Sequence, residues 1–193
     1  MKQSNKERAV LTILKNPEKE FNSNSLSGVM GISAMGTLKI LRGLEKEGVL
    51  VSRKISNIRI FGIDFGNDYA RGYISFILKK EREFLGGVVK RWVGEVAKAG
   101  SPELAILFGS VLGSRSPKDI DVLFVVGKEN FSKLKKEVED INLLNEKKIH
   151  PVYQTKEDFL ENIRKGDVVV LGAVKGIVVC GSDLLVKLIG ESK

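Results

Sequence analysis

Two apolar runs joined by a short polar loop, within residues 105–126, most constrain how this chain can fold. The first run ends at Gly109-Ser110, and the second begins at two aspartates, Asp119 and Asp121. Side chains at positions i and i+2 of a strand point to the same face, so both carboxylates project together. If the two runs pair side by side, we expect the carboxylates to face the Gly-Ser turn.

This arrangement of residue types suits a metal ion beside a phosphate group. Carboxylate oxygens are the ligands that magnesium prefers. The backbone N–H groups of a tight turn can hold an anion. The stretch therefore predicts a combined site for a divalent cation and a phosphate.

Gly109-Ser110 at one strand end, with Asp119-x-Asp121 opening the next strand, resembles the signature of the nucleotidyltransferase superfamily, in particular its small minimal branch. The resemblance covers roughly residues 84–190. It implies that the two aspartates hold one or two Mg2+ ions, which bridge the phosphates of an NTP that is a substrate or a ligand. The implied reaction moves a nucleoside monophosphate onto a hydroxyl of a protein, a nucleic acid or a small molecule.

The same resemblance gives roles to the loop. Gly109 would let the backbone approach phosphate closely, and Ser110 would donate its hydroxyl and N–H to the β- or γ-phosphate. Arg115 and Lys118 would add positive charge. Asp119 would act with Asp121 in catalysis as well as in metal binding.

The sequence departs from the family pattern where a third carboxylate is expected on the next central strand. Residues 148–153 contain no acid, and His150 takes the aligned position. Imidazole can act as a base or a ligand, but magnesium prefers oxygen. Lys118 also stands where the family usually has a serine. Three interpretations follow: an active enzyme, a regulator whose inactive domain senses a nucleotide or supports a dimer, and an antitoxin-like protein with a separate toxin partner.

Positive charge is concentrated in the N-terminal third of the chain. The whole chain carries a formal charge of +8, and residues 1–66 hold eleven Lys or Arg against six acids, a net of 11 − 6 = +5. Residues 48–63 contain three basic residues and no acid. An excess of this kind favours an anionic partner, and we expect double-stranded DNA.

The order of elements in this segment also indicates a DNA-binding fold. We expect a helix over residues 5–15 capped by Asn5, a short second helix closed by Gly31, and a third helix that follows the cap Ser33. Apolar runs around the Ser56-Asn57 turn then predict a β-hairpin.

Residues 32–39, running into residues 44–50, resemble the recognition helix and wing entry of winged-helix transcriptional regulators. The resemblance implies that the third helix enters the major groove and the hairpin touches the DNA backbone. A winged helix used only for protein contacts is the alternative. The side chains implied to lie near bases or phosphates are Ser33, Thr37, Lys39, Arg42, Arg53, Lys54 and Arg59.

These observations predict an α+β protein: a winged helix over residues 1–66, a linker helix over residues 67–83 with a homodimer contact, and a mixed-sheet nucleotidyltransferase-like α/β domain over residues 84–193. A last helix would be capped by Ser182. Cys180 is expected to be a buried structural thiol. No apolar stretch reaches membrane-spanning length, so we expect no membrane partner and a cytoplasmic location.

Overall fold

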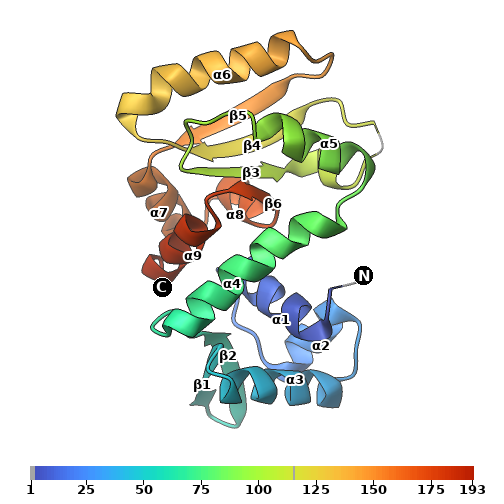
Figure 1. The fold of residues 1–193 in the computed structure, drawn as a ribbon. Helices are drawn as coiled ribbons and strands as arrows, with labels where there is room; N and C mark the ends of the chain where they lie inside the picture. The colour runs from blue at the N-terminus through green and yellow to red at the C-terminus, as the bar shows by residue number, and fades with distance from the viewer. Residues whose placement is uncertain (1–2, 115) are drawn as a thin grey trace. The chain divides into compact units, whose positions relative to one another are not determined.

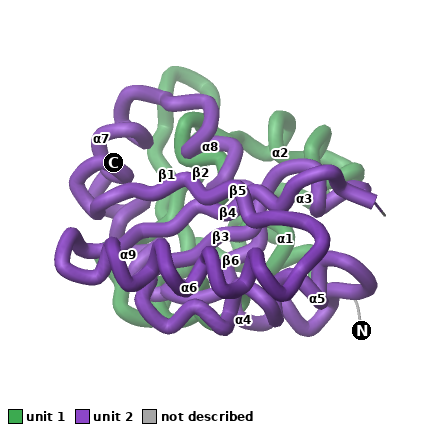
Figure 2. The backbone as a smooth tube through the Cα atoms, turned by 90° about the horizontal axis from the view of Figure 1, so that it is seen from above, with its two compact units in different colours: residues 1–77 green, residues 78–193 purple. Residues whose placement is uncertain are grey.

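A computed structural model describes residues 3–114 and 116–193 of the chain. It divides into two compact units, residues 1–77 and residues 78–193, which Figure 2 colours separately. Helices and a mixed sheet are both present, which confirms the α+β class predicted from the sequence. In the described residues, no helix has both the length and the apolar character needed to cross a membrane.

Unit 1 has the element order of a winged helix (Figure 1): three helices, a two-stranded antiparallel hairpin and the first part of a further helix. These elements are α1 (Asn5–Leu14), α2 (Ser23–Met30), α3 (Ala34–Lys46), β1 (Leu50–Ile55), β2 (Ile58–Ile63) and α4 (Asp68–Glu81), which continues into unit 2.

Helix caps in unit 1 agree with the sequence prediction at one helix and correct it at another. Ser33 caps α3 as predicted, and its side chain accepts a hydrogen bond from the Gly36 N–H. The predicted cap Asn5 is instead the first residue of α1, and Ser4 is the cap. Ser4 and Glu7 form a capping box, in which each side chain accepts from the other's backbone N–H. The box satisfies the backbone N–H groups of Ser4 and Glu7 at the start of the helix.

The core of unit 1 lies where α1, α2 and α3 meet the hairpin. Leu41 and Leu44 on α3 are fully buried, as their helical spacing predicts. The hairpin is attached through Phe21, whose carbonyl oxygen accepts from the Phe61 N–H at 2.8 Å. Ser56, at φ 53°, forms the left-handed turn between the strands.

Unit 2 is a four-stranded sheet with helices on both faces (Figure 1). After the end of α4 and a 3-10 turn (Arg82–Phe84), its elements are α5 (Gly87–Val96), β3 (Leu104–Phe108), a 3-10 turn (Gly109–Leu112), β4 (Ile120–Val125), a 3-10 turn (Lys128–Asn130), α6 (Phe131–Leu143), β5 (Ile149–Gln154), α7 (Lys156–Lys165), α8 (Val168–Val174), β6 (Ile177–Cys180) and α9 (Ser182–Glu191).

The strand order of this sheet is β5-β4-β3-β6. Strand β3 pairs antiparallel with β4 and β6, and β4 pairs parallel with β5. The pairing of β3 with β4 confirms that the two apolar runs lie side by side. Trp92 of α5 and Leu134 of α6 pack on one face with Val122 and Phe124 of β4, while α7, α8 and α9 cover the other face (Figure 1).

The predicted cap of the last helix is wrong by one position. Ser182 is the first residue of α9, and the N-cap is Gly181, at φ 78°. A Cβ atom at Gly181 would lie 2.1 Å from the Glu103 carbonyl oxygen. This close approach between backbones requires glycine, and no side-chain cap is present.

Cys180 is expected to react slowly with thiol reagents. Burial raises the pKa of its thiol, and its Sγ lies 3.9 Å from the Pro102 carbonyl oxygen. The thiolate is the reactive species, so alkylation by iodoacetamide at neutral pH should be at least about tenfold slower in the folded protein than in urea. Mass spectrometry of timed samples measures both rates; equal rates would contradict the expectation.

Candidate functional site

The exposed face of α3 and the hairpin carries most of the basic side chains predicted to bind DNA. Lys39 and Arg42 are exposed on α3, and Lys54 is exposed on β1. None of these three forms a salt bridge with a described residue. Their charges are therefore available to an anionic partner.

A groove of about 410 Å3 lies within unit 1, between α3, the hairpin and the start of α2. Its basic lining residues come from three successive elements, α3, β1 and β2. Because the groove also holds polar side chains from the start of α2, it combines positive charge with neutral hydrogen-bonding groups. The lining residues that bear on function are Arg42, Lys54, Arg59, Asn22, Ser23 and Asn24.

The two remaining arginines of the predicted set are held by acids of unit 1. Arg53 pairs with Glu20, and the Arg59 guanidinium lies 3.5 Å from a Glu45 carboxylate oxygen. These pairs were not predicted, because each joins residues at least 14 positions apart in the sequence. Both arginine side chains are at least half exposed, so the pairs contribute little to stability.

Thr37 corrects the predicted DNA-binding set. Its side chain is fully buried, and its hydroxyl donates to the Ser33 carbonyl oxygen at 3.1 Å. A threonine at this helical position satisfies its hydroxyl on the preceding turn. Thr37 therefore belongs to the packing of α3, and its side chain does not reach the surface that would face DNA.

In unit 2, three of the predicted catalytic side chains lie at one end of β4. Asp121 is the register partner of Phe108 on β3 and of His150 on β5. Asp119 comes just before the strand, and its carboxylate lies 3.6 Å from the His150 imidazole nitrogen. These side chains lie on the sheet face opposite Val122, because adjacent residues of a strand alternate between faces.

Gly109 lies directly against the Asp121 carboxylate. It adopts φ 77°, and a Cβ atom there would lie 2.1 Å from a carboxylate oxygen of Asp121. The backbone can approach the acid this closely only because the residue lacks a side chain. The Gly109 backbone in the turn after β3 and the Asp121 carboxylate of β4 are thus in direct contact.

Two of the other predicted phosphate ligands neighbour residues of this site in the sequence: Ser110 follows Gly109, and Lys118 precedes Asp119. Ser110 and Lys118 are exposed, and Arg115 lies outside the described residues. Among residues 3–114 and 116–193, no three His, Cys, Asp or Glu side chains converge in the manner of a metal site. Strand β5 offers His150 where a third carboxylate would complete such a group.

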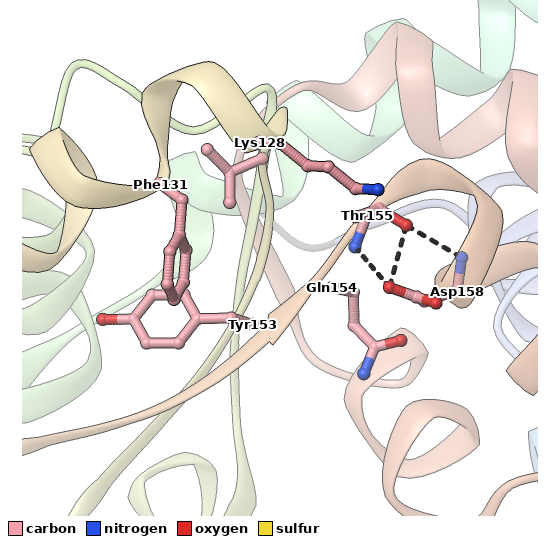
Figure 3. Close-up of a pocket in the computed structure, with 7 residues that line it drawn as sticks. Lys128, Phe131, Tyr153, Gln154, Thr155 and Asp158 are labelled. Carbon is pink, nitrogen blue, oxygen red and sulfur yellow. Dashed lines mark hydrogen bonds between the residues drawn. The ribbon is translucent and has the colours of Figure 1, made fainter.

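A second cavity, of about 300 Å3, lies at the opposite end of β4 and β5 (Figure 3). Sequence reasoning missed it, because its walls come from a strand end, a loop and two helix starts that only the fold brings together. Burial and the Glu139 carboxylate raise the pKa of its Tyr153 phenol. The residues that line this cavity include Val126, Lys128, Phe131, Tyr153, Gln154 and Asp158.

Comparison with known proteins identifies no family for this chain. Neither a family model nor a curated protein sequence matches it. Solved structures similar to part of it include the adhesin competence repressor AdcR from Streptococcus pyogenes, at 20% identity and a TM-score of 0.36 over 49% of this chain and 68% of that one. Another is Sso10a-2, a DNA-binding protein from Sulfolobus solfataricus, at 23% identity and a TM-score of 0.32 over 49% of this chain and 96% of that one. Similarity at this level carries no conclusion about function.

Proposed function

We propose that the chain binds double-stranded DNA through α3 and the hairpin of unit 1, as a winged-helix regulator would. The observation that carries this proposal is the groove in which Arg42, Lys54 and Arg59 converge. Each phosphate that a cation neutralises releases condensed counterions, so a few such contacts give strong, salt-sensitive affinity.

In the proposed complex, the start of α3 lies in the major groove and the hairpin follows the phosphate backbone. Ser33 and Lys39 lie toward the DNA from α3, and Lys54 contacts phosphate from the hairpin. Arg53 and Arg59 exchange their carboxylate partners for phosphates. This exchange costs little, because exposed ion pairs are worth at most about 1 kcal/mol.

The direct test is a titration of fluorescently labelled duplexes of mixed sequence, followed by anisotropy at several salt concentrations. We expect log affinity to fall linearly with log salt, with a slope of about −3 to −5 if three to five phosphates are neutralised. An absence of binding at about 50 mM salt, or a slope near zero, would rule out this function for unit 1.

As a second function, we propose that unit 2 binds Mg-NTP at the end of β4. The contact between Gly109 and the Asp121 carboxylate supports this proposal, because it places a turn that could receive phosphate beside a metal-binding oxygen. Asp119 supplies the second carboxylate, and Ser110, Lys118 and Arg115 remain the proposed phosphate ligands. His150 is the proposed third polar group of this site, because its imidazole nitrogen lies 3.6 Å from an Asp119 carboxylate oxygen.

Whether nucleotidyl transfer follows depends on the acceptor hydroxyl, which needs a base. His150 could accept that proton. Because no carboxylate occupies the position of His150 on β5, we favour binding of the nucleotide without nucleotidyl transfer. The chain would then be a DNA-binding protein that senses a nucleotide. The toxin-partner alternative and the homodimer through residues 67–83 stay predictions; Tyr69 and Phe76, each 57% exposed on α4, would be contact residues for such a dimer.

We expect Asp119→Asn/Asp121→Asn to weaken Mg-dependent NTP binding by about a hundredfold, since even residues supporting metal ligands cost 10- to 100-fold when changed. Isothermal titration with each of the four NTPs, with and without Mg2+, measures the effect. Asp140→Asn/Glu157→Gln removes the same charge from exposed positions on α6 and α7 and should bind normally. Equal loss in both variants would indicate a general charge effect.

Turnover is measured in the same samples as pyrophosphate release and as transfer of radiolabel to the protein or to added DNA. The enzyme interpretation requires release that depends on Asp119 and Asp121. Tight Mg-NTP binding without release would favour the sensing role. If no NTP binds at all, the second function fails and the DNA-binding proposal is untouched.

A further inference from the structure

The cavity between the ends of β4 and β5 and the starts of α6 and α7 is separate from the proposed nucleotide site (Figure 3). Asp121 lies at the beginning of β4, and Val126 follows its last residue. A strand of this length extends about 17 Å. In sheets with parallel strands, ligands commonly bind beyond the carboxyl ends of those strands, and β4 and β5 are the parallel pair.

Two aromatic rings form one wall of this cavity. The Tyr153 ring meets Phe131 edge to face, at 5.1 Å between ring centres and 88° between ring planes. Behind Tyr153 lies the buried Phe124 ring, at 5.9 Å. Phe131 remains 38% exposed, and buried Val126 completes the apolar surface. A third planar ring could pack here in the offset or edge-on arrangements that aromatic groups prefer.

The polar side of the cavity carries one cationic donor, the Lys128 ammonium. Lys128 extends across the cavity (Figure 3) and forms no salt bridge with a described residue. The Gln154 side chain points toward α7, where its carbonyl oxygen accepts from Asn162 at 2.7 Å.

Asp158, the acid that lines the cavity, is committed to its own helix. One of its carboxylate oxygens accepts from the Thr155 N–H and hydroxyl, at 3.2 and 2.8 Å. The Thr155 hydroxyl in turn accepts from the Asp158 N–H at 3.1 Å. These bonds lower the pKa of Asp158, with a smaller contribution from Lys128. The acid therefore caps α7, and the Lys128 ammonium remains to meet a ligand.

We propose that this cavity binds a small aromatic carboxylate. The ring packs against Phe131 and Tyr153, and the carboxylate accepts from the Lys128 ammonium. The volume, about 300 Å3, is at the lower end for small-molecule sites, which suits a single ring better than a nucleotide. This site is independent of both functions proposed above.

The test uses 15N-labelled full-length protein and four probes with one ring and one carboxylate: benzoate, salicylate, 4-hydroxybenzoate and phenylacetate. We expect at least one to give saturable shifts in the backbone resonances of Val126, Phe131 and Tyr153. Benzylammonium, which has the ring with the opposite charge, and acetate, which has the charge without the ring, should bind at least about tenfold more weakly. Absence of saturation with all four probes overturns the proposal.

Two variants, with one control, test whether the charge of Lys128 and the ring of Phe131 each contribute to binding. Lys128→Met keeps most of the side-chain stem and removes the charge, and should weaken carboxylate binding about tenfold. Lys136→Met makes the same change at an exposed position of α6 outside the cavity and should leave affinity unchanged. Phe131→Ala should weaken binding about fivefold through the lost ring contact.

Three results would contradict the site as proposed: equal binding of benzoate and benzylammonium, equal effects of the two lysine variants, or acetate shifting the same resonances with the same affinity. The last would mean adventitious anion binding at Lys128. The amide spectrum of each variant reports whether it is folded, so loss of structure is distinguished from loss of the ligand.

Discussion

Replacing Arg42, Lys54 and Arg59 together by alanine is expected to weaken binding to double-stranded DNA about a hundredfold near 100 mM salt. The three side chains line one groove of unit 1 and come from α3 and the hairpin. If each neutralises one phosphate, the slope of log affinity against log salt should become about 2.7 smaller in magnitude, at about 0.9 per contact. Anisotropy titrations at four or more salt concentrations measure both quantities.

The matched control is Lys90→Ala/Lys133→Ala/Lys136→Ala, which removes the same charge from exposed positions of unit 2. It should leave the slope nearly unchanged if the DNA contacts the groove of unit 1. Equal losses in the two triple variants would indicate attraction by net charge alone, and would contradict a specific surface on α3 and the hairpin. An unchanged slope in the groove variant would contradict it as well.

Replacing Gly181 by alanine is expected to lower the free energy of unfolding of unit 2 by about 3 kcal/mol. The new Cβ atom would meet the backbone of residues 103 and 104: the Glu103 carbonyl oxygen at 2.1 Å and the Leu104 Cα atom at 2.7 Å. Neither can move without disturbing β3, the central strand that pairs with both β4 and β6. The left-handed backbone at φ 78° adds to the strain.

Urea unfolding followed by the fluorescence of Trp92 measures this change in unit 2 alone, since Trp92 is the only tryptophan and is buried in the core of that unit. Gly172→Ala is the matched control. Gly172 lies in α8 with open space around its Cβ position, so alanine there should stabilise by about 0.5 kcal/mol. Similar midpoints for the two variants would show that the chain can relax around position 181.

The elements of the fold could be predicted from the sequence more fully than the functional sites. The elements themselves follow from local rules: the cap Ser33 predicted α3, the Ser56-Asn57 turn predicted the hairpin, and two apolar runs around a polar loop predicted the paired strands β3 and β4. Cap positions were less certain, because Ser4 and Asn5, or Gly181 and Ser182, are neighbouring residues that both look suitable. A contact 78 residues away in the sequence, from Gly181 to Glu103, decides between the latter pair.

Site residues depended even more on long-range contacts. Thr37 lies on the predicted recognition helix, but the rotation of that helix against α1 and α2 buries it. Arg53 and Arg59 carry the predicted charge, yet each forms an ion pair, with Glu20 and Glu45 respectively. The aromatic cavity was not predicted, because Phe131 and Tyr153 lie 153 − 131 = 22 positions apart in the sequence and only the fold brings their rings together.

For the stretch from Gly109 to Asp121, the sequence by itself determined which chemical groups are present, that two strands flank them, and that no third carboxylate follows on β5. The tertiary structure decided that Gly109 touches Asp121, that Asp119 reaches His150, and that a second cavity opens beyond the far end of β4. The physical reason is that strand and helix formation depend on nearest neighbours, whereas register and close approach depend on the packing of the whole sheet.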